Sequence, residues 1–201
     1  MAMAQLHELA IFPLATVLFP GGALPLRIFE ARYMDMVRDC MQRDLPFGVC
    51  LITRGAEVGE AAEHEPVGCL ARITEWDMQQ LGLLQITARG EERFRILERQ
   101  VLASGLTRAR IEPLPADLDA PLPDEFLACA RLLRLVIEEH GARTIEAPFR
   151  FDSSSWVSLR LCEILPVPLA AKQKLMELAD SRERLEILQK FLEQHGLVKR
   201  T

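Results

Sequence analysis

The hydrophobic pattern of the chain changes from a period of two in the first half to a helical period in the second half. Over residues 83–89 apolar and polar side chains alternate, which is typical of a strand with one buried face. Short apolar or alternating runs predict further strands over residues 47–53, 67–74, 92–97 and 107–113. About six short strands separated by turns predict an antiparallel sheet that closes into a barrel.

Residues 90–97, which follow the first alternating run, predict a turn and a second strand with one face in the core. Residues 90–92, Gly-Glu-Glu, predict a turn between two strands. After this turn, Phe94 and Ile96 are expected to point inward. The arginines between them, Arg93 and Arg95, are expected to point to solvent.

One apolar stretch near the start carries Pro13, Pro20 and Pro25 and a Gly-Gly pair. Proline cannot donate to a strand ladder, so it is confined to strand ends, edges and bulges. The pattern predicts two short apolar strands bent by proline over residues 11–22, a glycine turn, and an edge strand over residues 23–29. Such prolines suit a small, sharply coiled barrel and protect its edges from unwanted pairing.

One helix is predicted within this β-rich half, over residues 29–44. Its apolar residues recur at helical spacing and form one stripe: Phe29, Tyr33, Met36, Val37 and Cys40. Residues 55–66 are small and acidic, which is typical of a mobile surface loop.

The second half predicts a helical bundle. A stripe that begins at Phe126 is expected to end at Gly141, and further helices are expected over residues 152–166, 168–179 and 180–196. Prolines and aspartates between residues 113 and 124 indicate a linker. We therefore predict an α+β protein with a β-rich lobe over residues 1–116 and a helical lobe over residues 117–201.

Composition narrows the class of protein. Of the 201 residues, 49% are hydrophobic and 26% are charged, as in soluble globular proteins. The net charge of −5 argues against a dedicated nucleic-acid binder, which usually has a basic footprint. The chain has neither an apolar run near the ~18 residues of a membrane-spanning helix nor a secretory signal at its start. We expect no membrane association.

The five cysteines are widely spaced and odd in number, without a CxxC pair. They are interpreted as reduced, mostly buried thiols rather than as a zinc site or a disulfide framework. This pattern predicts a cytoplasmic protein.

Motifs for the common chemistries are missing. The sequence contains no GxxxxGK[ST] loop, no GxSxG elbow and no HExxH helix. Residues 153–155, three serines, are interpreted as helix caps. The four histidines are interpreted as capping or surface residues, although any of them could activate a cysteine: His7, His64, His140 and His195. We predict no catalytic residue, no metal and no cofactor.

Two features suggest a binding role. Glu30 and Arg32 flank the start of the first helix, where they either form an internal ion pair that locks the helix to the sheet or line a binding groove. Trp76 is expected at a hairpin tip, as a lid on the core or as an exposed contact residue. With the neighbouring Tyr33, these residues form the predicted polypeptide-binding set: Glu30, Arg32, Tyr33 and Trp76.

Several stretches carry a resemblance to one family. The segment FPLATVLFPGGALPLRIFEARY resembles the opening signature of the Lon protease N-terminal domain, with FEARY in place of the usual FEPRY. VGCLARI, LLQITARGEERFRIL and LCEILPVPLAAKQKLMELADSRERLEIL resemble the later strands and the helical tail of that family, in the same order. The resemblance implies a pseudo-barrel similar to PUA domains, followed by a helical bundle.

The resemblance implies recognition of polypeptides. We expect a free-standing member of the family without the ATPase and serine-lysine protease domains, and therefore no proteolysis. Expected partners are unfolded or tagged polypeptides, with a protease as a further candidate. The alternative is an RNA-binding PUA-like protein, against which the net charge of −5 and the aromatic content of 6% argue. A small hydrolase that uses cysteine and histidine is a third hypothesis.

Overall fold

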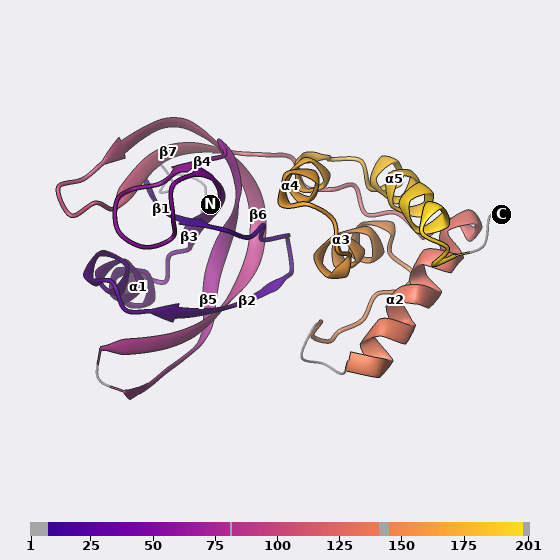
Figure 1. Ribbon diagram of the computed structural model, residues 1–201, viewed down its shortest axis with the longest axis horizontal. Coiled ribbons are helices and arrows are strands. Elements are labelled where there is room, and N and C mark those ends of the chain that lie inside the picture. Colours follow the sequence, from indigo (N-terminus) through magenta and orange to yellow (C-terminus); the bar gives the residue numbers. More distant parts are fainter. Residues whose placement is uncertain (1–7, 81, 141–144, 199–201) are drawn as a thin grey trace. The chain divides into compact units, whose positions relative to one another are not determined.

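The computed structural model describes residues 8–80, 82–140 and 145–198 (Figure 1). The chain divides into two compact units, Met1–Leu114 and Pro115–Thr201. The first unit is built mainly from strands and the second from helices, so the predicted α+β class is confirmed. The chain divides between Leu114 and Pro115, whereas the sequence pattern puts the domain boundary after residue 116.

Residues 8–80 and 82–114, which the structure describes in the first unit, form seven strands and one helix. In chain order these are β1 (Leu9–Leu14), β2 (Ala23–Ile28), α1 (Ala31–Arg43), β3 (Phe47–Arg54), β4 (Glu63–His64), β5 (Val67–Gln80), β6 (Leu83–Val101) and β7 (Thr107–Pro113). Five strands form a closed ring in the order β1-β7-β6-β5-β3, because β3 also pairs with β1. The predicted barrel is confirmed.

The pair that closes the ring is parallel, with Ile11 opposite Gly48 and Leu14 opposite Leu51. The expectation of a wholly antiparallel sheet is therefore wrong at this pair. A parallel pair needs a crossover connection of a dozen or more residues, and the chain between β1 and β3, which includes β2 and α1, is long enough to supply it.

The prediction of a turn at residues 90–92 is wrong, because β6 runs through them without interruption. On the neighbouring strand Cys69 lies opposite Arg93 and Ala71 opposite Gly90, so β6 has one extra residue here. This two-against-one pairing is a β-bulge, which bends a strand without reversing it. A Cβ on Gly90 would lie 2.2 Å from the carbonyl oxygen of Phe19. The absence of a side chain at Gly90 therefore allows the backbone at Phe19 to approach β6 closely.

The bulge also changes the inward and outward alternation along β6. Phe94 is fully buried, as the sequence predicts, and Arg95 is exposed. Arg93, however, is buried with 3% exposure, which contradicts its predicted outward position. Strict alternation holds only while the ladder is regular, and the extra residue interrupts it.

The three early prolines lie where a missing N–H group costs little. Pro13 is paired with β3, beyond Ile11, which is the last residue of β1 paired with β7. Pro20 lies in the turn that precedes β2, and Pro25 lies within β2. Only one strand, β1, forms in residues 11–22, so the expectation of two strands there is wrong.

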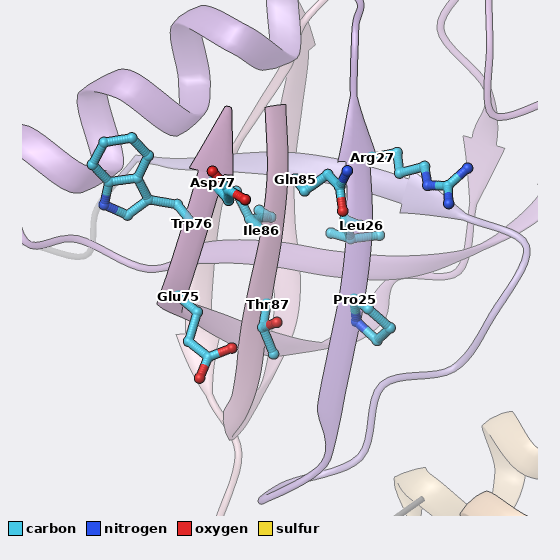
Figure 2. A pocket seen from close by; sticks show the side chains of 9 residues that line it. All are labelled: Pro25, Leu26, Arg27, Glu75, Trp76, Asp77, Gln85, Ile86 and Thr87. Atoms are coloured by element: carbon cyan, nitrogen blue, oxygen red, sulfur yellow. The ribbon is translucent and has the colours of Figure 1, made fainter. Parts of the chain in front are cut away.

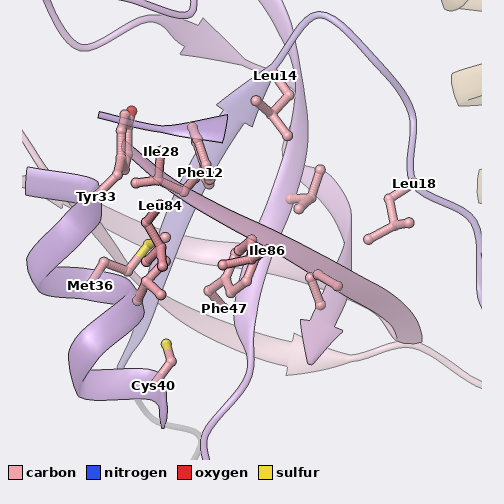
Figure 3. Packing of buried hydrophobic residues seen from close by; sticks show 14 of the residues in the cluster. Phe12, Leu14, Leu18, Ile28, Tyr33, Met36, Cys40, Phe47, Leu84 and Ile86 are labelled. Carbon is pink, nitrogen blue, oxygen red and sulfur yellow. The ribbon is translucent and has the colours of Figure 1, made fainter. Parts of the chain in front are cut away.

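Helix α1 packs its apolar stripe against the core of the barrel (Figure 3). Tyr33, Met36, Val37 and Cys40 are buried as predicted. Phe29 is different, because it precedes the helix and its side chain is 56% exposed. Its predicted place in the buried stripe is wrong, since the helix begins two residues later, at Ala31.

The acidic segment after β3 ends in a short strand. Glu63 and His64 form β4, which pairs with β3. His64 is only 7% exposed, so its interpretation as a surface histidine is wrong. Pairing with Ile52 holds the histidine against the sheet.

The second unit begins with a 3-10 turn, η1 (Asp124–Phe126), and continues with α2 (Leu127–His140), α3 (Ser154–Ile164), α4 (Leu169–Glu177) and α5 (Ser181–Gln194). The predicted serine cap is confirmed, because the Ser153 hydroxyl accepts a hydrogen bond from Trp156 N. Asp180 caps α5 in the same way, with its carboxylate accepting from Arg182 N and Glu183 N. The predicted cap at Gly141 lies outside the described residues.

A buried arginine ties the helices of the second unit together. Arg184 of α5 has 0% exposure, and its two terminal nitrogens lie 2.6 and 2.7 Å from one carboxylate oxygen of Asp117. The guanidinium also donates to the carbonyl oxygens of Leu175 and Leu178 and to the hydroxyl of Ser158. A buried charge is tolerated only when it is paired and hydrogen-bonded in this way.

Candidate functional site

Strand β2 is the edge strand on which the candidate site is built. Among the strands that the structure describes, its six residues pair only with β6, with Ala23 opposite Arg89 and Ile28 opposite Leu84. Leu24, Leu26 and Ile28 turn toward the core, and the alternate residues are exposed. An edge strand presents backbone groups that other chains can pair with.

An apolar hollow of about 510 Å³ lies along β2, and we call it the edge groove. Five consecutive residues of β2, Leu24–Ile28, line it, as expected when the edge of a strand rather than one face borders a groove. The lining also includes the buried Phe12, Leu14 and Tyr33. Phe29 and Val58 line it as well, and each side chain is 56% exposed.

A second hollow of about 750 Å³, lined by polar and apolar residues, lies over the ribbon formed by β2, β6 and the end of β5, and we call it the outer hollow. It is lined by three residues from each strand, Pro25–Arg27, Glu75–Asp77 and Gln85–Thr87, which Figure 2 shows in cross-strand rows. The two hollows share Pro25–Arg27, so β2 separates them.

Glu30 and Arg32 do form the ion pair that one interpretation predicted. Arg32 Nη2 lies 3.1 Å from Glu30 Oε2, and Arg32 Nη1 donates to the Gly105 carbonyl at 3.0 Å. Arg32 is 8% exposed and does not line either hollow, whereas Glu30 lines the edge groove. The ion-pair interpretation is therefore confirmed, whereas binding at the groove that Glu30 borders stays a prediction.

Tyr33 is fixed between an aromatic ring and a cation. Its ring stacks on Phe12 with centroids 4.0 Å apart, and the Arg32 guanidinium carbon lies 4.6 Å from its centroid. Burial raises the pKa of the Tyr33 phenol, Arg32 opposes that rise, and Glu30 adds to it. The neutral phenol therefore borders the groove as a polar group among apolar neighbours.

The acidic segment after β3 reaches the groove through two hydrogen bonds. Ala15 N donates to Glu57 Oε1 at 2.7 Å, and Gly59 N donates to Glu30 Oε2 at 3.4 Å. These bonds position Val58, which lines the groove between them. The sequence pattern describes this segment as a surface loop and gives no sign of its place at the groove.

Trp76 lies within β5 opposite Ile86, not at the hairpin tip as predicted. It is 60% exposed and lines the outer hollow, so it is not a lid on the core. The four predicted residues therefore occupy different places: Glu30 and Tyr33 at the edge groove, Arg32 behind it, and Trp76 at the outer hollow.

Sequence reasoning missed Arg27, Phe29 and Val58. The alternation in β2 could have indicated that Arg27 is exposed, because it stands two residues after an edge proline. Phe29 and Val58 lie at the groove because the folded barrel brings distant segments together, and the local sequence pattern does not predict this.

The cysteines do not provide an activated nucleophile. All five are free and buried. Burial raises the pKa of Cys40 and Cys129 to about 11 and that of Cys162 to about 12, and it also raises the pKa of Cys50 and so disfavours its thiolate. Across residues 8–80, 82–140 and 145–198, no three histidine, cysteine or acidic side chains gather as a metal site would require. In the same ranges, no helix combines the length and apolar character needed to cross a bilayer.

The family model for the ATP-dependent protease La (LON) substrate-binding domain matches residues 8–194. The chain belongs to this family. The match covers the barrel and all the helices described above, so both units are parts of the Lon substrate-binding fold. The family model describes the substrate-binding part of the protease.

Solved structures agree with this assignment. A Lon N-terminal domain protein from Xanthomonas campestris is 33% identical, with a TM-score of 0.76 over 91% of this chain and 97% of that chain. The N-terminal domain of the Mycobacterium avium complex Lon protease is 17% identical with a TM-score of 0.63, which supports the fold alone.

Two kinds of curated relative are similar in sequence. The Lon protease of Anaeromyxobacter dehalogenans (strain 2CP-C) is 26% identical over 92% of this chain and 23% of its own length. Protein cereblon of Danio rerio is 28% identical over 65% of this chain and 30% of its own length. The chain thus spans less than a third of the length of these curated relatives.

Proposed function

We propose that this Lon-type domain binds unfolded or tagged polypeptide segments at the edge groove without catalysing a reaction on them. The observation that carries the proposal is the apolar hollow of about 510 Å³ that lies against an edge strand of the barrel. Membership of a substrate-binding family supplies the functional context. A groove with apolar walls and backbone at its border suits chains that expose apolar side chains and unpaired amides.

The residues have distinct roles in this proposal. Phe29 and Val58 contact the apolar side chains of the client, because they are the exposed apolar residues of the groove. Glu30 and Tyr33 supply polar contacts at its border, and Arg32 positions both without touching the client. Trp76 contacts the part of the client that extends over the outer hollow.

Two further points belong to the proposal. The domain acts in the cytoplasm, which is supported by five free cysteine thiols in the described fold. It works as a capture unit, with a protease as candidate recipient of the bound client, since Lon proteases are among its relatives.

Binding to unfolded casein tests the proposal. We expect the fluorescence anisotropy of labelled casein to report a Kd in the micromolar range, about −8 kcal/mol. Because apolar burial drives the interaction, the affinity should change little between low and moderate salt. ATP hydrolysis and casein cleavage are expected to be absent from the purified protein.

Substitution of an exposed groove residue locates the site. Phe29→Ser should weaken casein binding about tenfold, since the loss of one ring contact is worth roughly 1–2 kcal/mol. The matched control is Leu97→Ser, because Leu97 is also a large exposed residue of the same unit but lines neither hollow. Equal effects of the two variants would contradict the groove as the site.

The RNA alternative is tested in the same assay. A phosphate backbone requires a basic surface and gives steep salt dependence, whereas the outer hollow carries the carboxylates of Glu75 and Asp77 beside Arg27. Tight, salt-sensitive binding to poly(U) together with no binding to casein would move the assignment to RNA.

A further inference from the structure

The hydrogen-bond pattern at the start of β2 determines which backbone groups point away from the barrel. Gly90 N donates to the Gly22 carbonyl at 2.8 Å, and Gly22 stands one step before the Ala23–Arg89 pair. In an antiparallel ladder, hydrogen-bonded and non-hydrogen-bonded pairs alternate. Leu24, Leu26 and Ile28 therefore bond to β6, and the residues between them turn their N–H and C=O groups outward.

The outward residues are Ala23, Pro25 and Arg27. The position of Pro25 agrees with this assignment, because its missing N–H would break the ladder at an inward position. Within the described ranges, these residues make no backbone hydrogen bond to any segment other than β6. The free edge thus offers two N–H donors, from Ala23 and Arg27, and three carbonyl acceptors.

We propose that the client binds as an added strand on this free edge of β2, in an extended conformation. The inference rests on the proposed function and specifies how the same site recognises its client. The edge groove lies on one side of β2 and the outer hollow on the other, and they share Pro25–Arg27. The side chains of an added strand point alternately to the two sides.

The chemistry of the two hollows specifies the client's side chains. Every second side chain enters the apolar edge groove beside Phe29 and Val58, and the others face the exposed Arg27. Arg27 has no ion pair with any residue in the described part of the chain, so it favours a polar or acidic side chain directly beside it. Glu75 and Asp77, which line the same hollow on β5, disfavour acidic side chains farther from β2. The recognised class is an unfolded segment of alternating apolar and polar or acidic residues, without proline at the positions that donate.

Alternation also sets the register. A slip of one residue would move every apolar side chain of the client from the groove to the outer hollow, so only shifts of two residues conserve the contacts. A domain of this kind would accept many sequences, because the backbone supplies the hydrogen bonds and only the side-chain pattern is selected.

A second copy of the chain is a poorer occupant of the edge. The antiparallel register of β2 on β2 that matches the outward residues, with Ala23 opposite Arg27, puts Pro25 opposite Pro25, where neither residue has an N–H to donate. A client without proline at that point can donate to the Pro25 carbonyl. Proline at an edge is a recognised means of preventing self-pairing.

Backbone methylation of a synthetic client tests the proposal. The probe is a labelled, acetylated and amidated peptide of about eight residues that alternates leucine with serine or glutamate. In a strand added in either direction, only alternate amides face β2. Methylation of a facing amide should weaken binding roughly tenfold, through a lost hydrogen bond and a steric clash. Methylation of the next amide should change the affinity less than about twofold.

Variants of the edge itself provide the complementary test. Ala23→Pro removes an outward N–H, and Ala23→Ser is the matched control that retains it. Arg27→Pro removes the second outward N–H, and Arg27→Ala separates this effect from the loss of charge. Each proline variant should weaken the peptide roughly threefold to tenfold relative to its control. Unchanged far-UV circular dichroism and thermal midpoint would show that β2 remains folded.

The outcomes distinguish the mode of binding from the function. Strand addition is supported if the peptide loses affinity only when an amide facing β2 is methylated, and if the proline variants also bind the peptide more weakly. Strand addition is overturned if methylation of facing and of non-facing amides weakens binding equally. The proposed function remains intact in that case if casein still binds and Phe29→Ser still weakens casein binding. Absence of binding to both casein and peptide overturns both. A dimer that Ala23→Pro dissociates, measured by sedimentation equilibrium, overturns the proposal in favour of a second copy.

Discussion

Truncation of Phe94 should lower the free energy of unfolding of the barrel more than substitution of any exposed residue on the same strand. Phe94 has 0% exposure and packs in a cluster with Leu9, Ile11 and Ile111. A Cβ on Gly48 would come within 2.7 Å of the end of its ring, and a Cβ on Gly68 within 2.8 Å. The ring therefore fills space that two glycines leave open.

The magnitude follows from this packing. Removal of about 150 Å² of buried ring at about 25 cal/mol per Å² costs about 4 kcal/mol. Glycines have no side chain that could move into the gap, so the cavity should persist, and Phe94→Ala is expected to cost about 3–5 kcal/mol. Such a loss lowers the thermal midpoint by roughly 6–20 °C.

Urea unfolding measures this difference. Trp76 fluorescence in a Trp156→Phe background reports on the barrel, because the two tryptophans lie in different units. Leu97→Ala is the control, since Leu97 lies on the same strand with 44% exposure and should cost less than about 1 kcal/mol. A loss below about 1 kcal/mol for Phe94→Ala, with an unchanged urea slope, would refute the packing argument.

Three further substitutions test other parts of the fold. Arg184→Met should cost about 3–5 kcal/mol by circular dichroism, because it removes the guanidinium that forms the ion pair with the buried Asp117 carboxylate, and a loss under about 1 kcal/mol would contradict this role. Gly90→Ala should cost about 1–3 kcal/mol in the same measurement, since the new Cβ meets Phe19, and an unchanged midpoint would show that the bulge adapts. Burial lowers the pKa of His64, so its stabilising contribution is complete above the usual histidine pKa of about 6.5 and is lost as the pH falls below it. His64→Phe should therefore lose less stability than the wild type between pH 7.5 and 5.5. An equal dependence of the free energy of unfolding on pH in the variant and the wild type would refute this role of His64.

Local patterns predicted the elements because local physics forms them. The alternation of Leu84, Ile86 and Ala88 specifies a half-buried strand in any context, and the structure buries all three side chains. The cap at Ser153 was predicted in the same way, since a cap satisfies amides only two or three residues away. The resemblance to the Lon N-terminal domain, which the family match confirms, then joined these elements into one fold.

Local patterns failed where a residue meets a distant segment. Gly90 has the sequence signature of a turn, but the reason for a glycine there is the carbonyl oxygen of Phe19, 71 positions earlier in the chain. His64 stands in an acidic segment typical of the surface, and its pairing with Ile52 buries it. Neither contact leaves a periodic trace, because periodicity records only which face of an element is buried.

By itself the sequence determined the α+β class, the change from strands to helices along the chain and, apart from Phe29, the buried stripe of α1. These depend on neighbours within a few residues, or on a family signature that spans the chain. Tertiary structure alone decided that β1 and β3 close the barrel as a parallel pair and that Val58 meets Phe29 at the edge groove. It also decided that Trp76 and Tyr33 line different hollows. The physical reason is that a site made from four separate segments exists only after the ring has closed, and closure is a property of pairing between strands rather than of any strand alone.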